Sequence, residues 1–163
     1  MPCFLLAWAS ASYPLQGKMQ GKRPKILCLD DQPANLLVRK MLLEQFGCEV
    51  AAVHDAQACL RAATNERFDL ALLDYHLAEP VTGEDLARDL RICAPQMRLV
   101  ILTGDPKLPE TAVKSVDAVL IKGAGGPEGL LQIISDLLPD CTLKPRREPF
   151  FPGMFGGAEP EKD

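Results

Sequence analysis

The sequence lacks several features that mark common protein classes. Its 163 residues carry 18 lysines and arginines against 22 aspartates and glutamates, so there is no basic surplus to neutralise nucleic-acid phosphates. Its six cysteines include no CxxC pair of the kind found in zinc or thiol-exchange motifs. It has no internal repeat and no heptad run. These absences leave an ordinary globular domain, long enough to form a core without metal or disulfide support.

The first 24 residues form a mixed leader without a clear targeting signal. Its apolar stretch, residues 3–9, is too short to span a bilayer and follows no basic region, which a signal peptide needs. Met19 begins a stretch that resembles a native start, so we expect residues 1–24 to be disordered or partly non-native, with a secretory leader as the less favoured alternative. Most cysteines lie in apolar runs, which favours a reducing cytoplasm.

Residues 25–139 are strongly patterned and are predicted to form one domain, whereas residues 140–163 are a tail rich in proline and glycine. Within the domain, apolar runs of strand length alternate with amphipathic stretches. The expected strands are 25–29, 48–53, 68–73, 98–102 and 116–121, and the expected helices are 33–46, Asp55 through Ala63, 83–93 and 128–138, with a short or irregular one between 104 and 116. This alternation predicts an α/β fold, a doubly wound five-stranded parallel sheet.

Polar side chains follow four of these strands. They are Asp30 and Asp31 after the first, Asp74 after the third, Thr103 after the fourth and Lys122 after the fifth. Ligands of such sheets bind outside the carboxyl ends of the strands, so we expect all five to converge at one edge. Three carboxylates placed together repel one another unless a cation lies among them. Magnesium suits this set because it binds one or two carboxylates, keeps several waters and coordinates phosphate oxygens.

Asp74 is the expected nucleophile, because it stands alone after the most apolar run while Asp30 and Asp31 pair as metal ligands. A carboxylate can accept a phosphoryl group as an acyl phosphate. Lys122 and Thr103 would neutralise the phosphoryl oxygens, and their movement would act as a switch. Taken alone, Asp30 and Asp31 are better explained as a helix cap, but the full set favours a phosphoryl site.

Four stretches together resemble a response regulator receiver domain, the phosphoacceptor module of two-component signalling. They are Ile26 to Asn35, Leu70 to Leu77, Val100 to Gly104 and Val119 to Lys122. The resemblance extends over residues 25–139 and implies the flavodoxin-like (βα)5 fold of chemotaxis regulators. The tail is too short for an output domain, so we expect a stand-alone receiver.

The resemblance also implies chemistry and partners. Asp74 would take a phosphoryl group from the phosphohistidine of a sensor histidine kinase or histidine phosphotransfer protein. Asp31 would bind Mg²⁺ directly and Asp30 through water, with Asp74 and the backbone carbonyl of His76 as further ligands. The protein would act through contacts with a downstream protein, with homodimerisation left open. It would not be an enzyme beyond its own phosphorylation and dephosphorylation, and no nucleic-acid or membrane partner is expected.

Three departures from the family pattern affect signalling. Gly123 replaces the usual proline after the lysine, and a non-proline cis bond there would cost about 2.5–4 kcal/mol, so a looser loop is expected. Val119 replaces the family's switch aromatic, so no ring can swing inward. Pro106 and Pro109 shorten the fourth helix. The usual output face is therefore expected to differ.

Two other classes compete with a working receiver. Phosphatases of the haloacid-dehalogenase type also form an aspartyl phosphate, but they need a second aspartate where this chain has His76. A degenerate receiver, acting as a phosphorylation-independent docking module, fits the altered loop and Val119, while the complete acidic set argues against it. Metal binding separates a docking module from a phosphoacceptor, because only the phosphoacceptor needs Mg²⁺.

Phe150, Phe151, Met154 and Phe155 are unusual in a tail of this composition, and we hypothesise that they pack on the domain or on a second copy. Deletion of residues 145–163 should then lower thermal stability or change the oligomeric state. Thermal denaturation and size-exclusion chromatography measure both quantities. If neither changes, the hypothesis is wrong.

Overall fold

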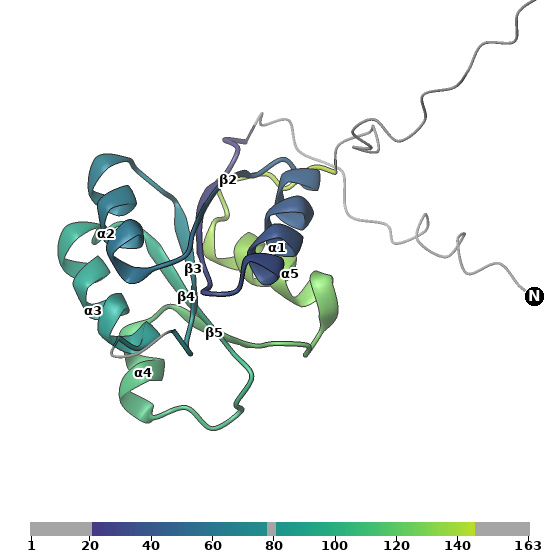
Figure 1. The fold of residues 1–163 in the computed structure, drawn as a ribbon. Helices are drawn as coiled ribbons and strands as arrows, with labels where there is room; N and C mark the ends of the chain where they lie inside the picture. Colours follow the sequence, from purple (N-terminus) through teal and green to yellow (C-terminus); the bar gives the residue numbers. More distant parts are fainter. Residues whose placement is uncertain (1–20, 78–80, 146–163) are drawn as a thin grey trace, which may run out of the picture.

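Five parallel strands form the central layer of the computed structural model, which describes residues 21–77 and 81–145 (Figure 1). The strands are β1 (Lys25–Leu29), β2 (Glu49–Val53), β3 (Leu70–Asp74), β4 (Arg98–Thr103) and β5 (Ala118–Ile121). Their order across the sheet is β2-β1-β3-β4-β5, and every neighbouring pair is parallel. The predicted doubly wound sheet is confirmed, with β1, β3 and β4 in its interior.

Helices cover both faces of the sheet. They are α1 (Pro33–Gln45), α2 (Ala56–Asn65), α3 (Gly83–Cys93), α4 (Glu110–Ser115) and α5 (Gly126–Leu137). Figure 1 shows α1 and α5 on one side of the sheet and α2, α3 and α4 on the other. The helix α4 has only 6 residues and begins after Pro109, as the two prolines in this stretch predict.

Alternating strand residues supply two separate apolar cores. In β1, Leu27 and Leu29 face the core that holds α2 and α3, whereas Ile26 and Cys28 face the core that holds α1 and α5. The same alternation divides β3, because successive side chains of a strand point to opposite faces. A strand buried on both faces must be apolar at every position, which explains the continuous runs in the sequence.

Local signals in the sequence position the helix starts. Asp55 caps α2, since its side chain accepts a hydrogen bond from the Ala58 N–H at 2.7 Å. Thr82 caps α3 and forms a reciprocal pair with Asp85, whose carboxylate accepts from the Thr82 N–H at 3.2 Å. None of the helices in the described ranges is long and apolar enough to cross a membrane.

The ordered structure continues a few residues beyond both predicted domain boundaries. Lys22 forms a parallel bridge with Cys141, and the Thr142 N–H donates to the Lys22 carbonyl at 3.3 Å. The Lys144 N–H donates to the Phe46 carbonyl at 3.0 Å. The aromatic residues of the tail and residues 1–20 lie outside the described residues.

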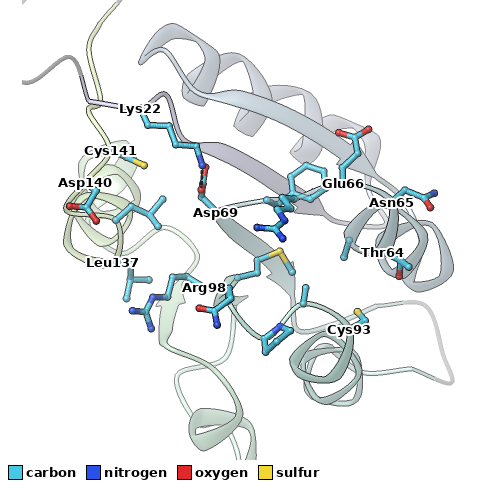
Figure 2. Close-up of a pocket in the computed structure, with 18 of the residues that line it drawn as sticks. Lys22, Thr64, Asn65, Glu66, Asp69, Cys93, Arg98, Leu137, Asp140 and Cys141 are labelled. Atoms are coloured by element: carbon cyan, nitrogen blue, oxygen red, sulfur yellow. Dashed lines mark hydrogen bonds and ion pairs between the residues drawn. The ribbon is translucent and has the colours of Figure 1, made fainter.

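A hollow of about 900 Å³ lies at the edge of the sheet where β3 and β4 begin (Figure 2). The ion pair between Lys22 and Asp69 lies on its wall, together with Cys93 and Cys141.

Three other cysteines, Cys28, Cys48 and Cys59, are buried in the fold away from this hollow. Burial raises the pKa of their thiols to about 12. These three cysteines therefore stay protonated and serve as apolar core residues.

Asp117 joins the start of β5 to β4 and α3. Its carboxylate accepts hydrogen bonds from the Leu99 N–H at 2.8 Å, from Arg91 at 2.6 Å and from Arg98 at 3.1 Å. Burial works to raise the pKa of Asp117, but these donors and the charge of Arg91 outweigh burial and lower it. The ionised form is therefore the one that stabilises the fold.

We expect Asp117→Asn to lower the free energy of unfolding by about 1.5–3 kcal/mol at neutral pH, because two arginines lose an ionised acceptor. The depressed pKa means that this difference is complete above the unfolded pKa of about 3.9 and fades as the pH falls through the lower folded value. Urea denaturation across this range measures it, with the exposed Asp89→Asn as control. A loss that is equal at every pH would contradict the assignment.

Candidate functional site

The carboxyl ends of two neighbouring strands, β1 and β3, bring the predicted carboxylates together. Asp30 and Asp31 directly follow β1, and Asp74 is the last residue of β3, beside it in the sheet. One oxygen from each of the three lies within 4.8 Å of the others. Such a group matches the oxygen ligands that a hard divalent cation requires.

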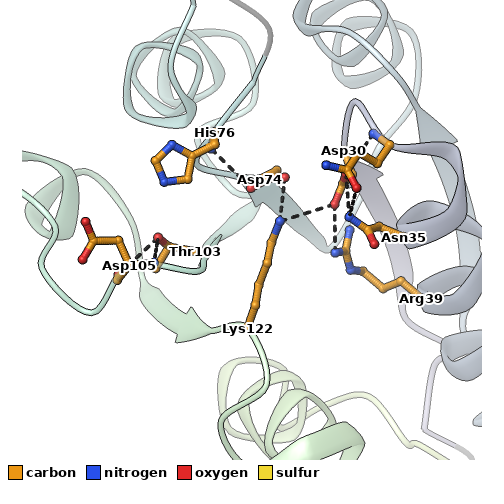
Figure 3. A network of polar contacts seen from close by, with 9 residues as sticks. Asp30, Asn35, Arg39, Asp74, His76, Thr103, Asp105 and Lys122 are labelled. Atoms are coloured by element: carbon orange, nitrogen blue, oxygen red, sulfur yellow. Dashed lines mark hydrogen bonds and ion pairs between the residues drawn. The ribbon is translucent and has the colours of Figure 1, made fainter.

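Lys122 completes this cluster from the other side. It follows β5, and its Nζ lies 2.7 Å from Asp74 Oδ2 and 3.7 Å from Asp30 Oδ2 (Figure 3). The Asp74 side chain is 3% exposed, and its second oxygen accepts a hydrogen bond from the His76 N–H at 3.2 Å. The buried carboxylate therefore has a cation and a backbone donor, which together offset its desolvation.

Asp30 is fully buried and has the most hydrogen-bond partners of the three carboxylates. Its Oδ1 accepts from the Gln32 N–H at 2.9 Å and from Asn35 Nδ2 at 3.3 Å, and Arg39 lies 3.2 Å from Oδ2. Burial alone would raise the pKa of Asp30. The Gln32 and Asn35 hydrogen bonds, then the charge of Lys122 and the Arg39 contact, reverse this effect and lower the pKa.

Asp31 and His76 are exposed at the rim of the site. Asp31 thus contributes the carboxylate that is open to solvent, while Asp30 and Asp74 are enclosed. The ring of His76 packs edge-on against Tyr75, with centroids 5.1 Å apart, and it is the backbone N–H of His76 that contacts Asp74. The carbonyl of His76 as a metal ligand stays a prediction.

Thr103 ends β4 at the same edge, but its hydroxyl is engaged locally. Its Oγ1 accepts from the Asp105 N–H at 3.0 Å and contacts the Asp105 carbonyl at 3.2 Å. Figure 3 shows the side chain turned toward Asp105 and away from Asp74. The strand places Thr103 as predicted, while its side chain has to rotate before it can contact a group on Asp74.

Glycines shape the loop after Lys122. Gly123 and Gly125 have positive φ values of 85° and 74°, which favour glycine, and the Ala124 N–H donates to the Ile121 carbonyl at 3.0 Å. Val119 lies within β5, half-buried and paired with Ile101 of β4. The described site therefore has an aliphatic side chain where the family has its switch aromatic.

Three residues of the site have roles that sequence reasoning missed. Asn35 and Arg39 both contact Asp30, and they are one helical turn apart on α1, where the sequence predicts a helix but no site residue. Gly83 begins α3 so close to β3 that an added Cβ would lie 2.6 Å from the Asp74 carbonyl oxygen. The i, i+4 spacing of Asn35 and Arg39, soon after the aspartate pair, is the sequence feature that could have indicated their contact with Asp30.

Comparison with known proteins agrees with this geometry. The family model of the response regulator receiver domain matches residues 26–124. The chain therefore belongs to the response regulator receiver domain family. It is a receiver domain of two-component signalling.

The curated relatives are much longer proteins. The chain is 44% identical over 59 residues to the sensor protein GacS of Pseudomonas syringae. The matched stretch covers 36% of this chain and 6% of that protein. It is 35% identical over 99 residues to the alginate biosynthesis transcriptional regulatory protein AlgB of Pseudomonas putida. This match covers 61% of this chain and 22% of that protein. The chain thus spans less than a quarter of the length of these relatives.

Solved structures of similar size match the whole domain. A receiver domain protein from Methanospirillum hungatei, described as CheY-like, has a TM-score of 0.66 and 31% identity, over 73% of this chain and 97% of that one. A response regulator from Burkholderia pseudomallei, solved with a phosphorylated aspartic acid, a calcium ion and citrate, has a TM-score of 0.62 and 27% identity, over 70% of this chain and 66% of that one.

We expect Lys122→Gln to lower the free energy of unfolding by about 1–2 kcal/mol in metal-free buffer, because the buried Asp74 carboxylate loses its cation. In a protein that already carries Asp74→Asn, Lys122→Gln should cost much less, since the neutral amide needs no cation. Urea denaturation of the two single variants and the double variant measures the coupling. Lys40→Gln, whose partner Glu44 is 3.8 Å away on the surface, is the control. Additive effects of the two substitutions would contradict the contact.

Proposed function

We propose that this chain accepts a phosphoryl group on Asp74, with Mg²⁺, as a response regulator in a two-component phosphorelay. The observation that carries the proposal is the buried Asp74 carboxylate, which lies 2.7 Å from the Lys122 ammonium and belongs to a group of three carboxylates. An isolated structural ion pair needs neither Asp30 nor Asp31 beside it. A phosphoryl acceptor needs all of these groups together.

The donor set fits Mg²⁺. Three carboxylate oxygens within 4.8 Å of one another are hard ligands, and Asp31 leaves one side of the group open to water and to phosphoryl oxygens. We assign Asp31 and Asp74 as direct ligands, Asp30 as a ligand through water, and the His76 carbonyl as a further ligand. When bound, Mg²⁺ would neutralise charge on the transferred group.

The transfer itself is a displacement at phosphorus. An oxygen of Asp74 attacks the phosphorus of a phosphohistidine on a sensor kinase or phosphotransfer protein, the P–N bond breaks, and the imidazole leaves with its electron pair and is protonated. The Lys122 ammonium already lies against Asp74 and would balance the charge that moves onto it. The His76 N–H holds the other carboxylate oxygen and orients the attack.

Phosphorylation would alter protein contacts through the neighbouring loop. The new group brings about −1.5 to −2 charge and three acceptor oxygens. Thr103 would exchange its bonds with Asp105 for a bond to the phosphoryl group, and the loop from Gly104 to α4 would move with it. Since Val119 carries no ring, the signal would pass through this loop to a downstream protein. The phosphorylated aspartic acid of the Burkholderia pseudomallei relative supports the assignment.

The proposed role is that of a signalling phosphoacceptor whose only reactions are its own phosphorylation and dephosphorylation. Its partners would be a histidine kinase or phosphotransfer protein and a further protein that recognises the phosphorylated form. The free, buried cysteines support a reducing cytoplasm as its location.

Incubation with Mg²⁺ and a small acyl phosphate should add the mass of one phosphoryl group to the parent protein and none to Asp74→Asn. Intact-mass spectrometry measures the addition, and chelation of the metal should prevent it. Asp89→Asn, an exposed aspartate on α3, is the matched control and should be modified like the parent.

Two results would contradict the proposal. Phosphate on Asp74→Asn would place the acceptor elsewhere. No addition to a folded, Mg²⁺-binding parent would instead favour a receiver that serves only as a docking module.

A further inference from the structure

Arg39 is a second cation at the acidic edge, and it reaches the edge from α1. Its Nη2 lies 3.2 Å from Asp30 Oδ2, and its side chain is 11% exposed. Figure 3 shows Arg39 meeting Asp30 from α1 while Lys122 approaches from the end of β5. The two cations therefore share one oxygen of Asp30, at 3.2 and 3.7 Å.

Both oxygens of Asp30 already face donors of the protein, which favours contact with a metal ion through water over direct coordination. A carboxylate offers about four lone-pair sites. At Oδ1 they are taken by the Gln32 N–H and by Asn35, and at Oδ2 they face Arg39 and Lys122. Asp30 is thus neutralised by groups of the protein before any cation enters the edge.

Arg39 is more enclosed than Lys122, because its side chain is 11% exposed against 34% for Lys122. Its Nη1 is a buried nitrogen without a hydrogen-bond partner among the residues that the structure describes, so the guanidinium is only partly satisfied and depends on Asp30. Its side chain also lines a cavity of about 340 Å³ with the apolar residues Val38, Leu42 and Leu130. Apolar surroundings screen a charge poorly, so the field of Arg39 acts strongly on the site.

We propose that Arg39 is a positioning residue that lowers the affinity of the acidic edge for Mg²⁺ and keeps Lys122 available to Asp74. With two protein cations against three carboxylates, little net charge remains to attract a divalent ion. Arg39 also takes the Asp30 oxygen that would otherwise draw Lys122 away from Asp74. The inference rests on the proposed function, because Mg²⁺ is the cation assigned there.

Titration of the full chain with Mg²⁺, followed by isothermal calorimetry at neutral pH, tests this role. Even with the screening of bulk water, one unit charge a few ångströms from a divalent ion changes its affinity by about tenfold, so Arg39→Gln should bind Mg²⁺ about tenfold more tightly. Arg39→Lys keeps the charge and should restore the affinity of the parent. Lys40→Gln removes a charge from the same helix without touching Asp30, and should leave the affinity unchanged.

A purely structural role predicts the opposite sign. If Arg39 only ordered Asp30, its loss would loosen the site and weaken Mg²⁺ binding, so weaker or unchanged binding in Arg39→Gln would overturn the inference. Should that variant fail to fold, Arg39→Met, an unbranched apolar side chain suited to the walls of the cavity, should show the same tightening.

The inference and the proposed function fail in different ways. An unchanged affinity in Arg39→Gln, with normal phosphorylation of the parent, would overturn the inference alone. If neither the parent nor the variant bound Mg²⁺, the metal assignment and the inference would both be wrong. Tighter binding in Arg39→Gln with no phosphorylation of the parent would leave the inference standing and overturn the proposed function.

Discussion

Mutual repulsion of three carboxylates is the constraint on which the rest of the acidic edge depends. The sheet brings Asp30, Asp31 and Asp74 within 4.8 Å of one another, and two of the three are buried. Buried like charges are tolerated only where fixed donors and cations compensate them. Lys122, Arg39, Asn35 and two backbone N–H groups supply this compensation, and each comes from an element whose position the sheet determines.

That compensation gives the two enclosed carboxylates different roles. Asp30 accepts hydrogen bonds from Gln32 before α1 and from Asn35 and Arg39 within it, so it acts as a fixed anchor for the cations around it. Asp74 has a single cation and a single backbone donor, which leaves it able to exchange partners. Thr103 hydrogen-bonds with Asp105, so its hydroxyl lies at the same edge without contacting Asp74. The chemistry of such a site depends on small rotations of side chains that are already in place.

The fold and the position of the site could be predicted from the sequence because both depend on local patterns. Five apolar runs mark strands buried on two faces, and a parallel sheet places whatever follows them at one edge. The contacts within the site could not be predicted in this way. Arg39 lies within a predicted helix, and only the packing of α1 against β1 shows that its guanidinium reaches Asp30. The bond between Thr103 and Asp105 depends on a loop conformation that no periodicity encodes.

The bridge between Lys22 and Cys141 also determines how the described chain enters and leaves the fold. Lys22 precedes β1, and Cys141 follows α5, so both lie at the edge where the strands begin. The acidic edge is at the other end of β1, and its five residues span about 16 Å. A label or surface tether attached through either of these segments would therefore leave the acidic edge facing outward, accessible to another macromolecule.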